Sequence, residues 1–167
     1  MSKLDLIRKK IFNSADPAYN QMLNIWRFQG RKIVFTNGCF DILHLGHVDY
    51  LSKARDLGNI LIVGLNTDLS VSKIKGDTRP IQDEMSRAMV LASLSFVDFV
   101  VFFGDDTPYN LIQLTQPDVL VKGADYKPED IVGYDIVKSK GGEIVTIEFL
   151  EGYSTTAIEN KIIGKRG

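Results

Sequence analysis

Five short apolar runs alternate with helical patterns along most of the chain, and this alternation constrains the fold more than any other feature. The runs are rich in Val, Ile, Leu and Phe and are apolar almost throughout, as strands are when both faces of a sheet are covered. Strands separated by helices predict a doubly wound parallel α/β sheet of five strands. The expected strands are residues 32–36, 59–65, 97–103, 118–122 and 143–148.

The expected helices are residues 46–57, 82–94, 108–115, 133–139 and 154–163. Residues 1–29 do not fit the alternation and look helical, with a break at residues 14–17. We therefore expect an N-terminal helical extension, residues 1–29, packed on a domain formed by residues 30–167.

Composition and charge exclude several classes of function. The net charge of −1 over 167 residues gives no basic footprint for a nucleic acid. The single cysteine, Cys39, allows neither an intrachain disulfide nor a multi-cysteine metal site. Residues 1–10 lack the apolar segment of a signal peptide, and no apolar run has the length of a bilayer span. We expect a cytoplasmic protein that binds neither nucleic acid nor membrane.

The loop after the first expected strand, residues 36–47, is the first place to look for a ligand, because open α/β sheets bind ligands beyond the carboxyl ends of their strands. It holds both histidines of the chain, His44 and His47, whose spacing puts them on one face of a first helical turn. That turn offers unpaired N–H groups and the positive end of a helix dipole. Gly38 and Gly46 allow a close approach of backbone and ligand. The loop predicts an anion site.

Each of these residues also has a simpler interpretation. A histidine near a helix start is more often structural than functional. Two histidines at this spacing also suit a metal, but no nearby cysteine or carboxylate completes a closed zinc site. Cys39 could act as a nucleophile, but no third group is evident, and a small turn residue is the favoured interpretation.

Asn37-Gly-Cys-Phe-Asp41 followed by His44-Leu-Gly-His47 resembles the His-x-Gly-His signature of the nucleotidyltransferase superfamily. Tyr153-Ser-Thr-Thr156, at the start of the last expected helix, resembles the Ser-Thr-Thr motif of the same superfamily, which holds NTP phosphates. Ser and Thr at a helix start are usually only N-caps, so the second motif depends on the first. The resemblance implies a Rossmann-like nucleotidyltransferase fold.

The resemblance also gives roles to two further regions. A lysine in the stretch with Lys73, Lys75 and Arg79 stabilises charge on the transferring phosphates, and we favour Lys75 over Lys73; the alternative is a solvated basic loop. Residues 121–126 lie near the nucleotide base and ribose in the family, although a simple turn after a strand fits them equally. The implied catalytic residues are His44, His47 and Lys75. The implied nucleotide-binding residues are Asn37, Gly38, Cys39, Phe40, Asp41, Gly46, Lys73, Arg79, Lys122, Gly123, Asp125, Tyr153, Ser154, Thr155 and Thr156.

Within the superfamily the chain most resembles the D-glycero-β-D-manno-heptose 1-phosphate adenylyltransferases, or ADP-heptose synthases, in a form without the sugar kinase to which they are often fused. The stretches that carry this resemblance are residues 31–41, 65–68, 75–80, 106–108, 117–126 and 152–156. Glycerol-3-phosphate cytidylyltransferases are the main alternative, but their two nucleotide-contacting arginines are replaced here by Ser95 and Phe149. A catalytically silent nucleotide-binding module is a third alternative.

The resemblance implies adenylyl transfer from ATP to the sugar 1-phosphate, giving ADP-heptose and pyrophosphate for lipopolysaccharide or related glycan precursors. Mg²⁺ is expected to bind mainly through the ATP phosphates, with no dedicated protein metal site. The partners are then small molecules, and related enzymes also suggest a homodimer.

Overall fold

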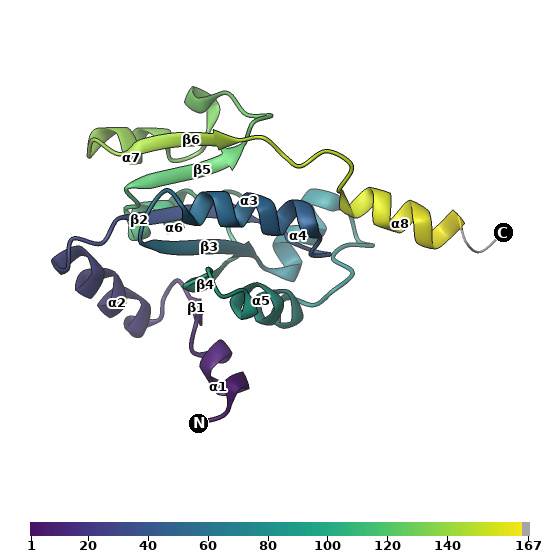
Figure 1. The fold of residues 1–167 in the computed structure, drawn as a ribbon, viewed down its shortest axis with the longest axis horizontal. Helices are drawn as coiled ribbons and strands as arrows, with labels where there is room; N and C mark the ends of the chain where they lie inside the picture. The colour runs from purple at the N-terminus through teal and green to yellow at the C-terminus, as the bar shows by residue number, and fades with distance from the viewer. Residues whose placement is uncertain (165–167) are drawn as a thin grey trace.

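The computed structural model describes residues 1–164 and contains one six-stranded sheet in which every pair of neighbouring strands is parallel (Figure 1). The parallel α/β architecture predicted from the sequence is therefore confirmed. The strand order is β1-β4-β3-β2-β5-β6. The strands are β1 (Ile11–Asn13), β2 (Ile33–Gly38), β3 (Ile60–Asn66), β4 (Phe99–Phe103), β5 (Val119–Gly123) and β6 (Glu143–Ile147).

The prediction of five strands is wrong, because β1 adds a sixth at the edge of the sheet. It pairs with β4 in the register Ile11↔Val100. The Lys10 ammonium fixes the approach to this strand by donating to the carbonyls of Ala92 and Val97 at 3.1 and 2.8 Å. A strand of three residues is too short to show the alternation that identifies strands in a sequence.

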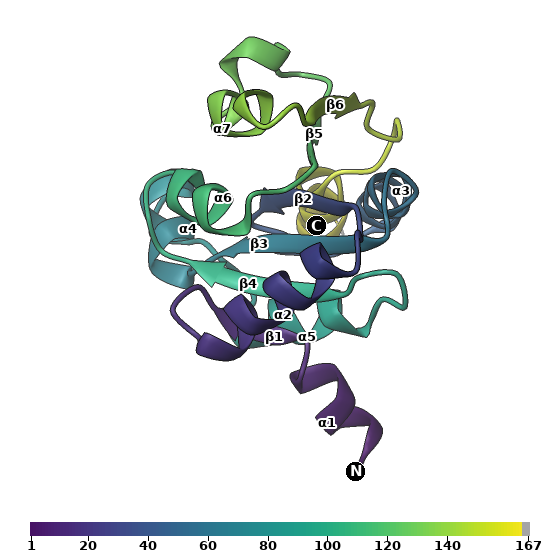
Figure 2. The same ribbon diagram turned by 90° about the vertical axis from the view of Figure 1, so that its left-hand side faces the viewer.

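The helices cover both faces of the sheet (Figure 2), as a doubly wound fold requires. One face packs against α3 and α5 through Leu51 and Leu91, and the other packs against α2 and α6 through Trp26 and Ile112. The helices are α1 (Lys3–Arg8), α2 (Pro17–Phe28), α3 (Leu45–Arg55), α4 (Asp68–Lys75), α5 (Glu84–Ser93), α6 (Tyr109–Thr115), α7 (Tyr134–Ser139) and α8 (Thr155–Gly164), with a 3-10 turn at Pro128–Asp130.

Two elements depart from the sequence expectation in ways that affect the site. Helix α4 follows β3 where only a basic loop was expected; it is mostly polar and buries only Ser70 and Val71. Strand β6 lies at the sheet edge with Glu143 and Thr146 exposed, so it is not covered on both faces as expected. Within residues 1–164, no helix is long and apolar enough to cross a membrane.

Candidate active site

A cavity of about 410 Å³ lies beyond the carboxyl ends of β2 and β5. The chain runs from β2 outward through β3 to β4 on one side and later places β5 on the other side of β2, so this position is the topological switch point of the sheet. The cavity combines the loops after these strands with residues from α3, α4 and α8. Its lining includes the predicted site residues Asn37, Gly38, Cys39, Phe40, Asp41, His47, Lys75, Lys122, Gly123, Asp125 and Thr155.

The loop after β2 is held in place by Asp41, whose side chain is almost fully buried. One carboxylate oxygen accepts the backbone N–H groups of Ile81 and Gln82 at 2.8 and 3.0 Å, and the other accepts Arg79 Nη1 at 3.0 Å. Burial alone would raise the pKa of Asp41, but the hydrogen bonds from Gln82 and Arg79 outweigh it and hold that pKa below its ordinary value. Just before it, Phe40 adopts a positive φ of 46°, which turns the chain sharply toward α3.

The two histidines lie stacked at the N-terminus of α3. Their ring centroids are 3.8 Å apart and the rings are inclined by 20°. His44 is the N-cap residue, yet its side chain makes no capping hydrogen bond. Within residues 1–164 four buried side-chain atoms make no hydrogen bond: Nδ1 of both histidines, Oδ1 of Asn37 and Oε1 of Glu159, although the last is ion-paired with Arg79. Buried polar atoms are normally paired, so the two histidines and Asn37 form an unusual cluster for a purely structural turn.

Burial favours the neutral form of both imidazoles. It lowers the pKa of His44, and together with the unfavourable interaction of a protonated His47 with His44 and Lys75 it lowers the pKa of His47 to about 4. A neutral imidazole keeps one N–H donor, and it is not repelled by a neighbouring ammonium group. Gly46 packs closely beside this pair: a Cβ there would lie 3.1 Å from the His44 ring and 3.2 Å from Tyr153 Cβ. The absence of a side chain at residue 46 therefore brings the histidine turn and the segment before α8 together.

The start of α8 lines a second, smaller cavity of about 330 Å³ next to His44. Tyr153 and Ser154 face it, and Ser154 Oγ also accepts the backbone N–H of Ala157 at 3.0 Å. The hydroxyl therefore acts as a helix cap and still has its own proton to donate. Thr155 lines the main cavity, whereas Thr156 is exposed and lines neither.

The structure separates the three basic residues near α4. Lys75 lines the main cavity, as preferred from the sequence. Lys73 is exposed, and its ammonium lies 3.9 Å from Asp106. Arg79 lines neither cavity; its guanidinium is paired with Asp41 and Glu159.

The loop after β5 closes the opposite wall of the main cavity. Burial lowers the pKa of the Lys122 ammonium to about 8, against the opposing charge of Asp125, and its Nζ lies 5.7 Å from the centre of the Tyr126 ring. Phe149 packs directly over Gly123, where a Cβ would lie 2.3 Å from the ring. A glycine at residue 123 is thus required for Phe149 to face the cavity.

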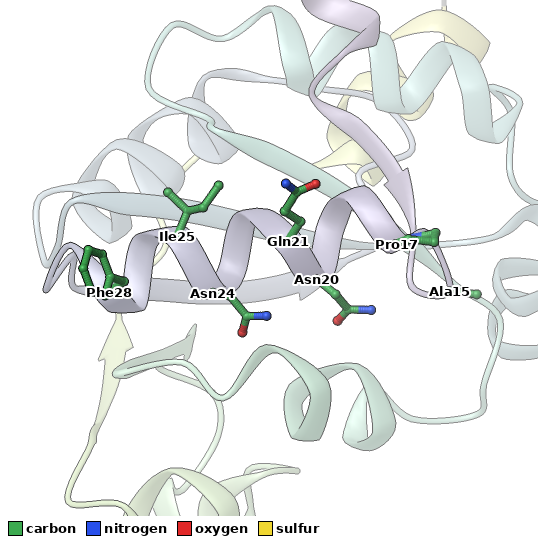
Figure 3. Close-up of a pocket in the computed structure, with 7 residues that line it drawn as sticks. All are labelled: Ala15, Pro17, Asn20, Gln21, Asn24, Ile25 and Phe28. Atoms are coloured by element: carbon green, nitrogen blue, oxygen red, sulfur yellow. The ribbon is translucent and has the colours of Figure 1, made fainter.

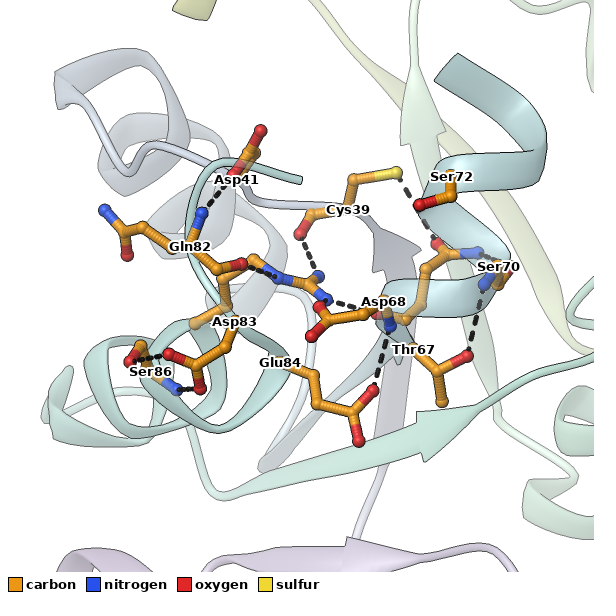
Figure 4. Close-up of polar contacts among 12 residues, drawn as sticks. Cys39, Asp41, Thr67, Asp68, Ser70, Ser72, Gln82, Asp83, Glu84 and Ser86 are labelled. Atoms are coloured by element: carbon orange, nitrogen blue, oxygen red, sulfur yellow. Dashed lines mark hydrogen bonds and ion pairs between the residues drawn. The ribbon is translucent and has the colours of Figure 1, made fainter. Parts of the chain in front are cut away.

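Two residues of the candidate site, Tyr50 and Arg87, were missed from the sequence. Tyr50 lines the cavity and shares a 2.8 Å hydrogen bond between its hydroxyl and that of Thr36. Arg87 is 1% exposed, and it donates to the Cys39 carbonyl at 2.6 Å and the Asn66 carbonyl at 2.9 Å. Its pairing with Asp68 at 2.7 Å completes a network that joins the loops after β2 and β3 (Figure 4). The available signal for Arg87 was a charge on the apolar face of the helix at residues 82–94.

A further hollow lies along α2 (Figure 3) and measures about 650 Å³. Its lining, which includes Asn20, Asn24 and Phe28, contains no ionisable side chain. This hollow therefore offers no charged group to a phosphate, unlike the cavity at β2 and β5 with Lys75 and Lys122. Among residues 1–164, no group of three or more His, Cys, Asp or Glu side chains could hold a metal ion.

Comparison with known families agrees with this arrangement. A family model described as cytidylyltransferase-like matches residues 35–161, which include the histidine turn and most of α8. The chain belongs to the cytidylyltransferase-like family. Relatives include proteins named bifunctional protein HldE: that of Wolinella succinogenes is 58% identical over 83% of this chain, and that of Nitrobacter hamburgensis is 54% identical over 94%. The chain spans only 28% and 32% of their lengths.

Solved structures show the same family fold. The lipopolysaccharide core biosynthesis protein from Thermoplasma volcanium matches with a TM-score of 0.61 and 29% identity, covering 73% of this chain and all of that one. A pantoate-beta-alanine ligase from Francisella tularensis matches with a TM-score of 0.57 over 94% of this chain and 79% of that one. Its identity of 20% shows a shared fold alone.

Proposed function

We propose that this cytidylyltransferase-like chain is a nucleotidyltransferase that joins a sugar 1-phosphate to a nucleoside monophosphate and releases pyrophosphate. The observation that carries the proposal is the stacked pair His44 and His47 at the N-terminus of α3, together with Lys75, which lines the same cavity as His47. Imidazole N–H groups, an ammonium and a helix N-terminus are all donors to phosphate oxygens.

The reaction needs alignment and charge stabilisation more than acid–base chemistry. A phosphate oxygen of the acceptor is already an anionic nucleophile and attacks the α-phosphorus of the NTP in line. The new P–O bond forms as the bond from the α-phosphorus to the bridging oxygen breaks, and pyrophosphate leaves with that electron pair. His47 and Lys75 stabilise the charge on the α-phosphate, and His44 with Ser154 and Thr155 binds the outer phosphates.

The proposed substrates are ATP and D-glycero-β-D-manno-heptose 1-phosphate. The sequence resemblance to ADP-heptose synthases supports this choice, and so do relatives named HldE at 54–58% identity and a similar structure named for lipopolysaccharide core biosynthesis. Since the HldE relatives are called bifunctional and this chain spans about a third of their length, it corresponds to one of two activities. Phe149, in place of an arginine expected of a cytidylyltransferase, is consistent with ATP.

Mg²⁺ is proposed as the counter-ion of the triphosphate. The donors around the cavity suit phosphate oxygens, and the carboxylate of Asp41 is already occupied by Arg79 and two backbone N–H groups. We therefore assign the ion to the phosphates themselves, where it neutralises charge. A homodimer remains a prediction from the family resemblance.

The deciding experiment measures pyrophosphate release with ATP or CTP and either the heptose 1-phosphate or glycerol 3-phosphate. ATP with the heptose should exceed CTP with glycerol 3-phosphate by at least about 10²-fold in kcat/KM, because a pocket that pairs with one base leaves polar groups unpaired with the other. If CTP is the better donor, the reaction class stands and the heptose assignment falls.

A paired measurement separates an enzyme from a silent nucleotide-binding module. His47→Ala should reduce turnover by about 10²–10³-fold, the effect of losing one preorganised donor. A wild-type protein that binds ATP but releases no pyrophosphate with any of the four pairs would favour the silent module. Unchanged turnover in a folded His47→Ala variant would remove His47 from the site.

A further inference from the structure

Helix α8 carries residues that the proposed function needs, yet it has few means of attachment to the domain. None of its described residues, Thr155–Gly164, is buried. The helix extends away from the sheet at the carboxyl ends of the strands (Figure 1). Its first turn must nevertheless meet the histidine turn, because Ser154 and His44 line one cavity and Thr155 and His47 line the other. A specific contact has to set this position.

That contact is made by three side chains, which we call the Arg79 bridge: Asp41 after β2, Arg79 after α4, and Glu159 on α8. Arg79 Nη1 donates to Asp41 at 3.0 Å, and Arg79 Nη2 pairs with Glu159. The three side chains are 1%, 21% and 20% exposed, in the order Asp41, Arg79, Glu159. An ion pair that is mostly shielded from water is worth more than one on the open surface.

The backbone of Arg79 and its partner Asp41 are both held by hydrogen bonds that do not involve α8. Its backbone N–H donates to the Gly76 carbonyl at 3.0 Å, and its carbonyl accepts the Ser72 hydroxyl at 2.6 Å. Asp41 is held in turn by two backbone N–H groups. The carboxylates on either side hold the pKa of Arg79 above its ordinary value. The guanidinium is therefore a rigid point from which Glu159, and with it α8, is positioned.

We propose that Arg79 is a positioning residue, which holds the first turn of α8 against the His44–His47 turn through Glu159 and so assembles the two halves of the phosphate site. This inference rests on the proposed nucleotidyl transfer. It differs from the role expected for Arg79 from the sequence, which was direct contact with phosphates. The two roles predict opposite results when Glu159 loses its charge.

The test uses Glu159→Gln, which keeps the size of the side chain, and Asn160→Ala as a control on the exposed face of the same helix. Two quantities are measured: hydrogen exchange of the backbone amides of residues 155–160 without ligand, and KM for ATP and kcat with heptose 1-phosphate. In Glu159→Gln the amides should exchange about fivefold faster, as expected for loss of one partly shielded ion pair. KM for ATP should rise about three- to tenfold with kcat within about twofold of wild type. Asn160→Ala should match wild type in both.

Two results would overturn the inference. A lower KM for ATP in Glu159→Gln would mean that Glu159 withholds Arg79 from the phosphates, so that Arg79 contacts them directly. Unchanged exchange would mean that the bridge does not hold α8. A wild-type protein without turnover on any nucleotide refutes the proposed function separately, and the exchange measurement still decides whether the bridge holds the helix.

Discussion

The folded protein should lose stability in mild acid through His47. Burial, with added effects from the charges of His44 and Lys75, lowers the pKa of this imidazole from 6.5 to about 4. The unfolded chain therefore takes up the proton first as the pH falls. The contribution of the neutral ring to the free energy of unfolding is complete above the pKa of His47 in the unfolded chain. It is lost progressively as the pH falls toward the pKa of His47 in the folded protein. The pKa difference is equivalent to about 3 kcal/mol, which the partial exposure of the ring reduces to about 2 kcal/mol.

Urea unfolding of wild type and His47→Gln, followed between about pH 7 and about pH 4.5, measures this contribution. The carboxylates titrate in both proteins, so the difference between the two stability curves isolates the histidine. Over this range the free energy of unfolding of wild type should fall by about 2 kcal/mol more than that of His47→Gln. His44→Gln serves as a matched comparison, since burial lowers the pKa of His44 as well. Parallel curves for wild type and His47→Gln would refute the burial argument and would indicate a protonated, solvated ring.

Three further outcomes test the candidate site. Lys75→Ala should reduce kcat/KM by about 10²-fold or more, the effect of losing a charge-stabilising donor. Lys73→Ala should change kcat/KM less than about threefold, because that ammonium is exposed beside Asp106. Equal losses in steady-state kinetics of the two variants would contradict the assignment. Cys39→Ala should keep most of its turnover, since transfer to a phosphate needs no thiol, and mass spectrometry that trapped a nucleotidyl adduct on Cys39 would reverse this view. Phe149→Arg should reduce the preference for ATP over CTP by about tenfold relative to Phe149→Leu; identical ratios in both variants would exclude Phe149 from base choice.

The sequence could predict the candidate site because its signals are local. The apolar run of β2, the glycines and the two histidines follow one another in one continuous segment. The fold class then determines at which edge of the sheet the end of this strand must lie. Helix α8 could be found from Ser154–Thr156 in the same way. The preference for Lys75 over Lys73 depended on resemblance and stays a prediction. The structure places only Lys75 at the cavity, because residues two apart do not share a helix face.

The contacts that hold the site together could not be read from the sequence, because they join distant segments. Arg87 stands out in the sequence only as a charge on the apolar face of α5, and only the fold brings the carbonyls of Cys39 and Asn66 around it. Arg79 likewise meets carboxylates from the loop after β2 and from α8. Strand β1 was missed for a different reason: its three residues form a strand only because the edge of β4 is available to pair with them.

Hydrogen-bond satisfaction distinguishes the side chains that await a ligand from those that support the site. His44, His47 and Asn37 keep buried polar atoms with neither a hydrogen bond nor an ion pair, whereas Oε1 of Glu159, which also makes no hydrogen bond, is ion-paired with Arg79. Asp41 and Arg87 are buried as well, but each makes several hydrogen bonds to protein groups. Neither side chain is therefore free to bind the substrate. By this criterion Arg79, paired at both of its terminal nitrogens, belongs with the supporting side chains although its charge alone would suit a phosphate.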